Sequence, residues 1–325
     1  MLHDTVPSDV TGDVGVRVLT ENNLDTADRI FRLAFGTFIG LPDPAAFGGT
    51  ADYVRTRFHA DPSAAFGAFE DGELVGSNFA ANWGSVGCFG PLTIRPDLWN
   101  RGIGRRLMKP IMACFERWGT AHAGLFTFPN SQKHVGLYQR FAFWPRFLTA
   151  LMSKPVATTE RRCESWSTLA GLPQSERDQR MTDCRALTDV VFAGLDVSVD
   201  VRSVAAQNLG DTVLLHDDSR LHGFAVCHCG AGTEAGTGTC YVKFGAVRPS
   251  RTAAQDFDSL LVACEEFAAQ AGATRLAAGV NMARHEAYVR MLQKGFRTDR
   301  HGLVMQRPNE DGYNRAGVYV MDDWR

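Results

Sequence analysis

The sequence predicts an α/β protein built from two tandem copies of one fold, each a mixed antiparallel and parallel sheet flanked by helices. Two observations support this prediction. Short apolar strand patterns alternate with amphipathic helix patterns, an order typical of α/β domains. The chain also has 325 residues, about twice the usual length of one domain, and its elements repeat at a fixed offset.

Four matching segments reveal the repeat. Ile94–Pro96 follows an apolar strand and is echoed by Val247–Pro249. Ala113–Glu116, on the next helix, is echoed by Ala263–Glu266. The offset is about 150 residues, which is one domain length. We therefore expect a tandem duplication.

The first domain is expected over residues 14–155. Asp71-Gly72 predicts a hairpin, because this dipeptide favours a two-residue turn between antiparallel strands. The expected strands are 14–19, 66–70, 74–83, 87–95, 123–128 and 146–153, and the expected helices are 22–36, 48–58, 102–118 and 131–141.

The second domain is expected over residues 179–325, after a linker at 156–178 that mixes charged residues with Ser, Thr and Pro. A turn is expected at Asp218-Ser219. The expected helices are 179–193, 200–208, 253–271 and 283–294, and the expected strands are 212–217, 221–229, 239–247, 274–280, 299–306 and 316–321.

Composition excludes several classes of partner. The net charge of −2 argues against nucleic-acid binding, and no segment approaches the about 18 uncharged residues of a membrane helix. The N-terminus has neither the basic start nor the apolar run of a secretory signal. We expect a cytoplasmic protein with no nucleic-acid or membrane partner, as a monomer or homodimer.

The eight cysteines lie mostly inside apolar patterns, so we interpret them as reduced core residues. Cys227-His228-Cys229 is the one cluster that suggests a metal. On a strand, however, Cys227 and Cys229 share one face while His228 points away, and no matching Cys-x-x-Cys exists. We expect no metal site.

The segment most informative for function is the loop around Gly102 and Gly104. Ile103, Leu107 and Ile111 form one buried helical stripe, so the two glycines lie at a helix N-terminus. Free N–H groups and the helix dipole favour an anion there. Nearby arginines add positive charge; they are Arg101, Arg105 and Arg106.

This loop resembles the acetyl-CoA pyrophosphate loop of the GNAT superfamily of N-acetyltransferases, usually Gln/Arg-x-x-Gly-x-Gly/Ala after an apolar strand. Trp99 stands where that family has Gln or Arg. The departure removes one phosphate contact and leaves the backbone cradle intact. The spacing fits neither a dinucleotide fingerprint nor a P-loop.

A second segment, 126–143, resembles the GNAT pattern Asn-x-x-Ala-x-x-Leu-Tyr-x-x-x-Gly-Phe. Tyr138 falls on the family's tyrosine, and Ala142 replaces its glycine before Phe143. The asparagine lies one residue early at Asn130, so either the turn holds an extra residue or Ser131 takes its place. The resemblance covers roughly residues 14–154.

The resemblance implies that acetyl-CoA binds where strands 87–95 and 123–128 splay apart, and that its pantetheine arm bonds to unpaired backbone groups. Tyr138 would act as general acid toward the departing thiolate. The cofactor-binding residues implied are Leu92, Thr93, Ile94, Asn100, Arg101, Gly102, Ile103, Gly104, Arg105, Asn130, Ser131 and His134.

No carboxylate or histidine lies in 86–94 or 123–128, where many such enzymes keep the general base. Glu70, at the end of the expected strand 66–70, is the candidate, and His134 is a weaker one. There are two alternatives for deprotonation of the amine: the second copy supplies the base, or the amine arrives neutral. Asp322 and Asp323, near the end of the sequence, could reach an amine, but a solvated end is the default expectation.

The second copy lacks the same features. Its loop after Pro249 is three residues shorter and has no glycine, and Met291 stands at the tyrosine position. We expect a degenerate domain that binds no CoA, covers the first copy and shapes the acceptor pocket.

The predicted activity is acetyl-CoA-dependent N-acetyl transfer to a small-molecule or peptide N-terminal amine. Aromatic residues near Phe35 suggest an apolar or aromatic acceptor. One alternative is a non-catalytic CoA-binding or regulatory module. A tandem enzyme resembling mycothiol synthase is another, although that resemblance would place activity in the C-terminal copy.

Overall fold

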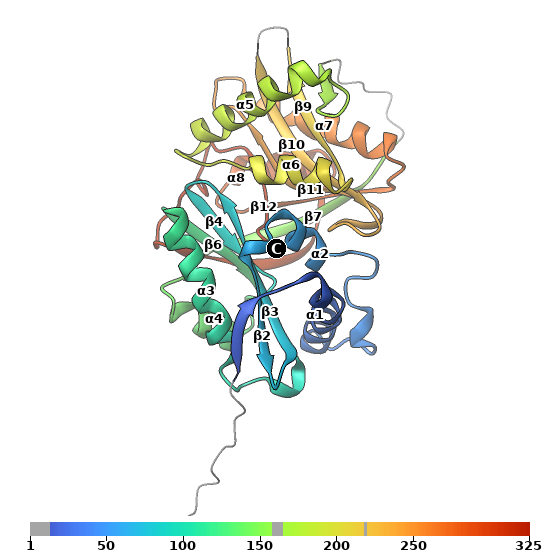
Figure 1. The fold of residues 1–325 in the computed structure, drawn as a ribbon. Coiled ribbons are helices and arrows are strands. Elements are labelled where there is room, and N and C mark those ends of the chain that lie inside the picture. Colours follow the sequence, from blue (N-terminus) through green and yellow to red (C-terminus); the bar gives the residue numbers. More distant parts are fainter. Residues whose placement is uncertain (1–13, 158–164, 218–219) are drawn as a thin grey trace, which may run out of the picture.

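A single sheet of 14 strands runs through the molecule, with helices packed on its faces (Figure 1). The computed structural model describes residues 14–157, 165–217 and 220–325. The first half of the chain forms the blue to green part of Figure 1, and the second half forms the yellow to red part. The α/β class and the mixed strand directions are as predicted.

The first half closely follows the predicted order. Asp71 and Gly72 form the hairpin turn, and both have the positive φ values, 50° and 85°, that such a turn needs. Short 3₁₀ turns cover Glu21–Asn23, Pro44–Ala46, Pro62–Ala64 and Pro96–Leu98. The main elements are β1 (Gly15–Val18), α1 (Leu24–Phe38), α2 (Val54–Ala60), β2 (Ala65–Glu70), β3 (Glu73–Trp83), β4 (Val86–Phe89), β5 (Thr93–Ile94), α3 (Ile103–Trp118), β6 (His122–Thr127), α4 (Gln132–Gln139) and β7 (Trp144–Pro155).

The second half repeats this order. Its elements are β8 (Trp166–Thr168), α5 (Gln174–Val191), α6 (Ser198–Ala206), β9 (Gly210–His216), β10 (Leu221–Gly230), β11 (Gly236–Val247), α7 (Ala253–Gln270), β12 (Arg275–Asn281), α8 (His285–Gln293), β13 (Arg297–Arg307) and β14 (Val320–Met321). β8 and the start of α5 fall inside the segment predicted as a linker. The turn expected at 218–219 lies outside the described residues.

The strand predicted at 87–95 is broken in two. Pro91 has no N–H to donate, and the chain leaves β4 there and pairs with β3 through β5, with Ile94 opposite Gly76. β4 runs parallel to β6 only from Val86 to Cys88. Beyond that point the two strands diverge, as the resemblance implies.

The second half has the same divergence, but the chain itself fills the gap. β11 runs parallel to β12 only from Thr239 to Val242, and farther along β14 pairs with β11, with Met321 opposite Gly245. The chain then packs on β12, because a Cβ added to Gly279 would lie 2.2 Å from the Asp323 Cβ. The place equivalent to the open gap of the first half is therefore occupied.

The two halves exchange strands. β13 of the second half lies between β6 and β7 of the first, and β7 in turn pairs with β12 of the second half. Each half therefore completes the sheet of the other. The domain boundaries expected at 155 and 179 stay a prediction, because the sheet runs across both.

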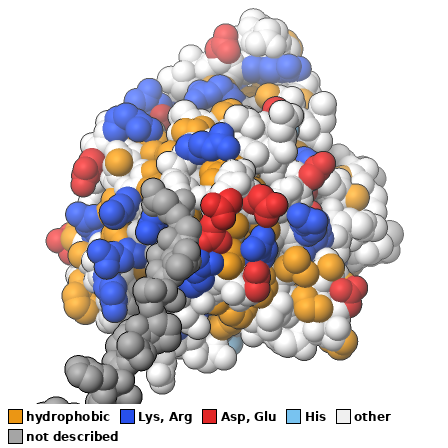
Figure 2. Space-filling view, turned by 60° about the horizontal axis from the view of Figure 1, so that its bottom comes forward, with side chains coloured by type: hydrophobic (Ala, Val, Ile, Leu, Met, Phe, Trp, Pro, Cys, Tyr) orange, Lys and Arg blue, Asp and Glu red, His pale blue; other side chains and the backbone are white. Residues whose placement is uncertain are grey.

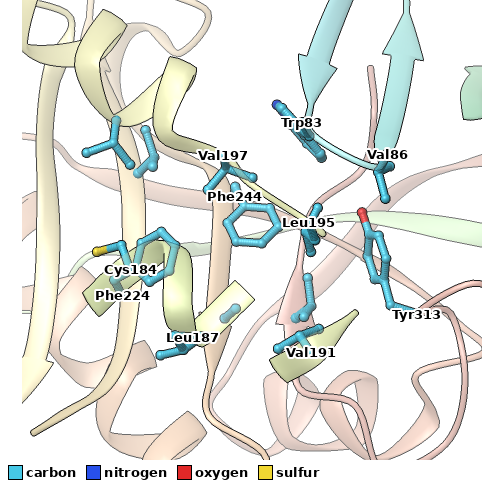
Figure 3. Close-up of a cluster of buried hydrophobic side chains, with 14 of the residues drawn as sticks. Trp83, Val86, Cys184, Leu187, Val191, Leu195, Val197, Phe224, Phe244 and Tyr313 are labelled. Atoms are coloured by element: carbon cyan, nitrogen blue, oxygen red, sulfur yellow. The ribbon is translucent and has the colours of Figure 1, made fainter. Parts of the chain in front are cut away.

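The hydrophobic core also crosses between the halves. Figure 3 shows Trp83 and Val86 of the first half facing Phe244, Leu195 and Tyr313 of the second. The Trp83 and Phe244 rings meet edge to face, with centroids 5.5 Å apart. Burial of such large aromatic side chains favours the association of the two halves.

The cysteines that the structure describes form no disulfide; Cys163 lies outside the described residues. Among the described residues no cluster of three side chains could hold a metal ion. Cys227 is buried in the core of the second half, whereas His228 lies on the opposite side of β10 near Tyr241. No helix in the described part of the chain is long and apolar enough to cross a membrane.

Candidate active site

A cavity of 980 Å³ lies where β4 and β6 diverge, bordered by α1, α3 and α4. The first half supplies most of its wall. The second half contributes residues from the β10–β11 connection, from β11, β12 and β13, and from the chain after β14; these are Glu234, Ala235, Thr239, Tyr241, Ala277, Arg300, Trp324 and Arg325. The cavity is therefore formed by both halves.

One end of the cavity meets the N-terminus of α3. Gly102 caps the helix with φ of 77°, and Asn100 also has a positive φ, 70°. A Cβ added to Gly104 would lie 3.3 Å from both Ile94 Cδ1 and Leu137 Cδ2, so glycine keeps the helix close to β5. The first N–H groups of an α-helix have no acceptor within the helix, and here they border the cavity. This end suits a phosphate.

Cationic side chains border the same end, and Figure 2 shows Lys and Arg side chains gathered on the side of the molecule where Figure 1 places α3 and α4. Arg105, Lys133 and Arg140 line the cavity. Arg101 does not. It forms an ion pair with Glu70 at 2.5 Å, and Glu70 is also absent from the lining. The predicted phosphate contact of Arg101 and the predicted base Glu70 are thus not brought to the cavity.

The edge of β5 that faces the gap is set by the register with β3. Arg95 N–H donates to the Val75 carbonyl at 2.9 Å, so in this antiparallel pair the backbone groups of Thr93 also face β3. Those of Ile94 face the gap. Ile94 therefore lies at the open edge, whereas Thr93, which was also expected to offer unpaired backbone groups, does not. The Thr93 hydroxyl is buried against Ser77, 3.2 Å away.

Trp99 now has a structural role. Its indole N–H donates to the Ile94 carbonyl at 2.8 Å, and Trp99 lines the cavity. The residue that departs from the family pattern therefore fixes the edge of β5.

Tyr138 lies on α4 and lines the cavity with a side chain that is nearly buried. Its ring packs edge to face on Phe89 of β4, with centroids 5.7 Å apart. Burial raises the pKa of Tyr138 above its ordinary value, so the hydroxyl keeps its proton. His134 lies one turn earlier and also lines the cavity; burial and the adjacent Lys133 lower its pKa.

Ser131 lies at the start of α4. It is the N-cap of α4, where its hydroxyl accepts the His134 N–H at 3.4 Å, and it lines the cavity. Asn130 lies in the exposed turn before it and does not. Ala142 has φ of 62°, a conformation that explains the family's glycine at this position.

The other end of the cavity is aromatic. Phe35 of α1 stacks on Phe47, with centroids 5.2 Å apart and planes at 15°. Phe38, also on α1, lies 4.7 Å from Phe128 and 5.0 Å from His134, centroid to centroid. The aromatic residues near Phe35 do border the cavity, as expected.

A loop of the second half closes this end. The connection between β10 and β11 and the start of β11 are hydrogen-bonded to the chain between α1 and α2. Thr237 N–H of β11 donates to the Thr50 hydroxyl at 2.8 Å, and Asp52 N–H donates to the Thr233 carbonyl of the connection at 2.9 Å. The sequence reasoning missed this loop, because no local pattern indicates a contact between segments so far apart.

Glu234 in that loop is the acidic residue among the described residues that line the cavity. Its side chain is fully buried. It accepts hydrogen bonds from Arg57 at 3.0 and 3.2 Å and from Lys243 at 2.8 Å. Arg57 and Lys243 hold the pKa of the Glu234 carboxyl well below its usual range, against the opposing effect of burial.

The expectation of a solvated charged end is wrong. Asp322 and Asp323 are both buried. Asp322 pairs with the buried Arg284 through Oδ1, and Asp323 accepts the Tyr241 hydroxyl proton at 2.9 Å. Trp324 then reaches the cavity wall of the first half.

Residues 29–143 match the sequence model described as "Acetyltransferase (GNAT) family". The matched segment includes the loop around Gly102 and Gly104 and also Tyr138. No curated protein matches the sequence significantly.

Solved structures resemble the whole chain. A putative acetyltransferase from Pyrococcus horikoshii aligns with a TM-score of 0.68 and 14% identity, covering 100% of this chain and 98% of that one. A GCN5-related N-acetyltransferase from Sphaerobacter thermophilus gives 0.59 and 13%, covering 90% and 95%. A tandem GNAT protein from the clavulanic acid biosynthesis pathway gives 0.54 and 12%, covering 90% and 98%. At these identities the similarity shows the shared tandem GNAT fold.

Proposed function

We propose that the protein transfers an acetyl group from acetyl-CoA to a primary amine, in the cavity of the first half. One observation carries the proposal. The half that matches the GNAT family brings the free N-terminus of α3, the open strand edge at Ile94 and the protonated Tyr138 to one cavity.

The residues present fit acetyl-CoA. The absence of a side chain at Gly104 keeps α3 close to β5, and the first N–H groups of α3 border the cavity where a pyrophosphate would bind; Arg105, Lys133 and Arg140 supply positive charge. Backbone groups of Leu92 and Ile94 would bind the amides of the pantetheine arm as an added strand would. Acetyl-CoA supplies a thioester carbonyl that an amine can attack.

Tyr138 is the proposed general acid. Its raised pKa keeps the hydroxyl protonated, so it can donate to the sulfur atom of the departing thiolate. A backbone N–H at the β4 to β5 break would stabilise the negative charge that develops on the carbonyl oxygen. Among the described acidic side chains, Glu234 lines the cavity and has no exposed area, which supports an amine that arrives neutral.

The acceptor proposed is an amine that carries an apolar or aromatic group. The rings around Phe35, Phe38 and Phe128 offer such a group a matching surface. Either a small molecule or the N-terminus of a peptide has this chemistry.

The second half is proposed to bind no CoA. β14 fills the gap between β11 and β12, α7 begins at Ala253 without a glycine loop, and the fully buried Met291 stands where Tyr138 stands in the first half. The proposed role of the second half is to complete the sheet and to form the wall of the cavity at its acceptor end.

Thiol release from acetyl-CoA over a panel of aromatic and aliphatic amines tests the activity, and calorimetry with CoA tests the stoichiometry. We expect turnover and one CoA bound per chain. The second candidate is a CoA-binding module without catalysis, which the buried state of Glu234 favours. Tight binding of one CoA with no turnover on any amine would support the non-catalytic module. Binding of two CoA molecules per chain would contradict the proposal that the second half binds no CoA.

A further inference from the structure

We propose that Glu234, a residue of the second half, is a positioning residue for acyl transfer in the first half, acting through Arg57 on the backbone at Gly90. The inference rests on the proposed acetyltransferase activity. In this proposal the second half influences the acyl-transfer step in addition to lining the cavity.

Glu234 does not itself meet a substrate. Its side chain has 0% exposure, and both carboxylate oxygens accept hydrogen bonds from protein cations. A carboxylate that is fully buried and forms ion pairs with two cationic side chains cannot take a proton from an amine in the cavity. Its effect on a reaction must therefore pass through the groups it holds, which are Arg57 and Lys243.

Arg57 links the second half to the strand break. From α2 it uses Nε and Nη2 to bind Glu234 in a two-pronged ion pair, and Nη2 also donates to the Arg325 carbonyl oxygen. Its Nη1 donates to the Gly90 carbonyl at 2.6 Å. The planar guanidinium has a fixed fork geometry, so the carboxylate sets the direction in which Nη1 points.

Gly90 lies at the point where β4 ends and the chain turns toward β5. Its N–H donates to the Phe79 carbonyl of β3 at 2.8 Å, and its carbonyl accepts from Arg57. Both polar groups of Gly90 are therefore fixed, one by the first half alone and one through Glu234. The next residues, Pro91 and Leu92, line the cavity.

The orientation of this segment matters for the proposed reaction. Leu92 lies between Gly90 and β5 and lines the cavity, and Ile94, two residues further on, directs its backbone groups to the gap. An N–H there is the group that would meet the carbonyl oxygen of a thioester. Stabilisation of a developing oxyanion depends steeply on donor geometry, and a displacement of about 1 Å can cost a factor of about 100 in rate.

The test replaces Glu234 by Gln, which keeps the size of the side chain and removes its charge. We expect kcat to fall about tenfold or more, with KM for acetyl-CoA and the affinity for CoA changed less than about threefold, because the phosphate end is untouched. Glu265→Gln is the matched control: Glu265 is also buried and pairs with Lys154 at 2.7 Å, but it does not line the cavity. It should lower the unfolding temperature and leave kcat unchanged.

Two further measurements identify the route. Glu234→Gln should lower kcat by the same factor at every pH from about 6 to 9, since the carboxylate is ionised throughout. In a double-mutant cycle, Arg57→Lys should lower kcat by itself, and adding Glu234→Gln should cost little more. Glu234→Asp should retain part of the activity and serves if the Gln variant does not fold.

An unchanged kcat in Glu234→Gln or Glu234→Asp would overturn the inference alone, provided that the wild-type protein turns over. Independent, multiplicative losses in the cycle would also contradict it. A loss that grows as the pH rises through the range would contradict it as well, because that pattern indicates a general base, which works only when deprotonated. Absence of transfer by the wild-type protein would instead overturn the proposed function, and this inference with it.

Discussion

Trp324 occupies the space directly over Gly124: a Cβ added to Gly124 would lie 1.8 Å from Trp324 Cζ3. Gly124 belongs to β6 of the first half, and Trp324 follows β14 of the second. This contact joins the segment that fills the second gap to the wall of the first.

Replacing Gly124 by Ala should therefore displace the Trp324 ring. We expect a loss of about 1–3 kcal/mol in the free energy of unfolding, the usual cost of overpacking, measured by urea denaturation. Gly136→Ala is the control, because no atom lies within 4 Å of the added Cβ and the position is helical. It should be neutral or stabilising by up to about 1 kcal/mol. Equal stabilities of the two variants would contradict the close contact.

Arg105 and Arg101 should differ in their contribution to CoA binding, although the sequence pattern treats them alike. Arg105 lines the cavity, whereas Arg101 pairs with Glu70. Arg105→Ala should weaken CoA binding about tenfold or more, the typical worth of a charge-assisted phosphate contact, and reduce its salt dependence. Arg101→Ala should change it less than about threefold. Calorimetry at two salt concentrations compares them, and the reverse order of effects would mean that the phosphates bind elsewhere.

Tyr138→Phe should lower kcat by about 10²–10⁴, the usual contribution of a general acid. Burial raises the pKa of Tyr138, so the donor form persists as the pH rises, and is lost only above the ordinary pKa of tyrosine, about 10. We therefore expect no alkaline fall in wild-type kcat from this group below about pH 10.

The control for Tyr138 is Tyr288→Phe, which removes a hydroxyl from α8, the equivalent helix of the second half. Its kcat should match that of the wild type. A Tyr138→Phe variant with full activity across the pH range would exclude this residue as the acid.

Phe35→Ala should change acceptor selectivity. The variant removes one member of the stacked pair with Phe47, so an aromatic amine loses contact area that a small aliphatic amine never uses. We expect kcat/KM to fall about tenfold for aromatic amines and less than about twofold for small aliphatic ones. Thiol-release kinetics on matched amines measure this, and equal losses for both classes would argue against an aromatic acceptor site.

The sequence was sufficient for features that depend on local chemistry. The turn at Asp71-Gly72, the start of α3 at Ile103 and the helix that carries Tyr138 all follow from glycine placement and apolar periodicity, and the structure confirms them. The break at Pro91 could have been predicted, because proline interrupts strands. The apolar residues on both sides of Pro91 instead led to the prediction of one continuous strand.

Ion pairs and hydrogen bonds between residues far apart in the chain could not be predicted from the sequence. Glu70 and Arg101 looked like a free base and a free phosphate ligand, and each instead neutralises the other. Asp322 and Asp323 near the end of the sequence suggested solvent exposure, yet Arg284 and Tyr241 hold them in the interior. Such pairs depend on tertiary packing, which periodicity does not encode.

The exchange of β7 and β13 has a consequence for how the protein is made. β6, the strand beside the gap of the first half, pairs on its other edge with β13, which is synthesised only after the intervening strands β7 to β12. Until β13 has been synthesised, one edge of β6 in the nascent first half has no partner strand. An unpaired strand edge is prone to association with other chains. Closure of the sheet is a long-range event, and the sheet beside the cavity is complete only after β13 of the second half has been synthesised.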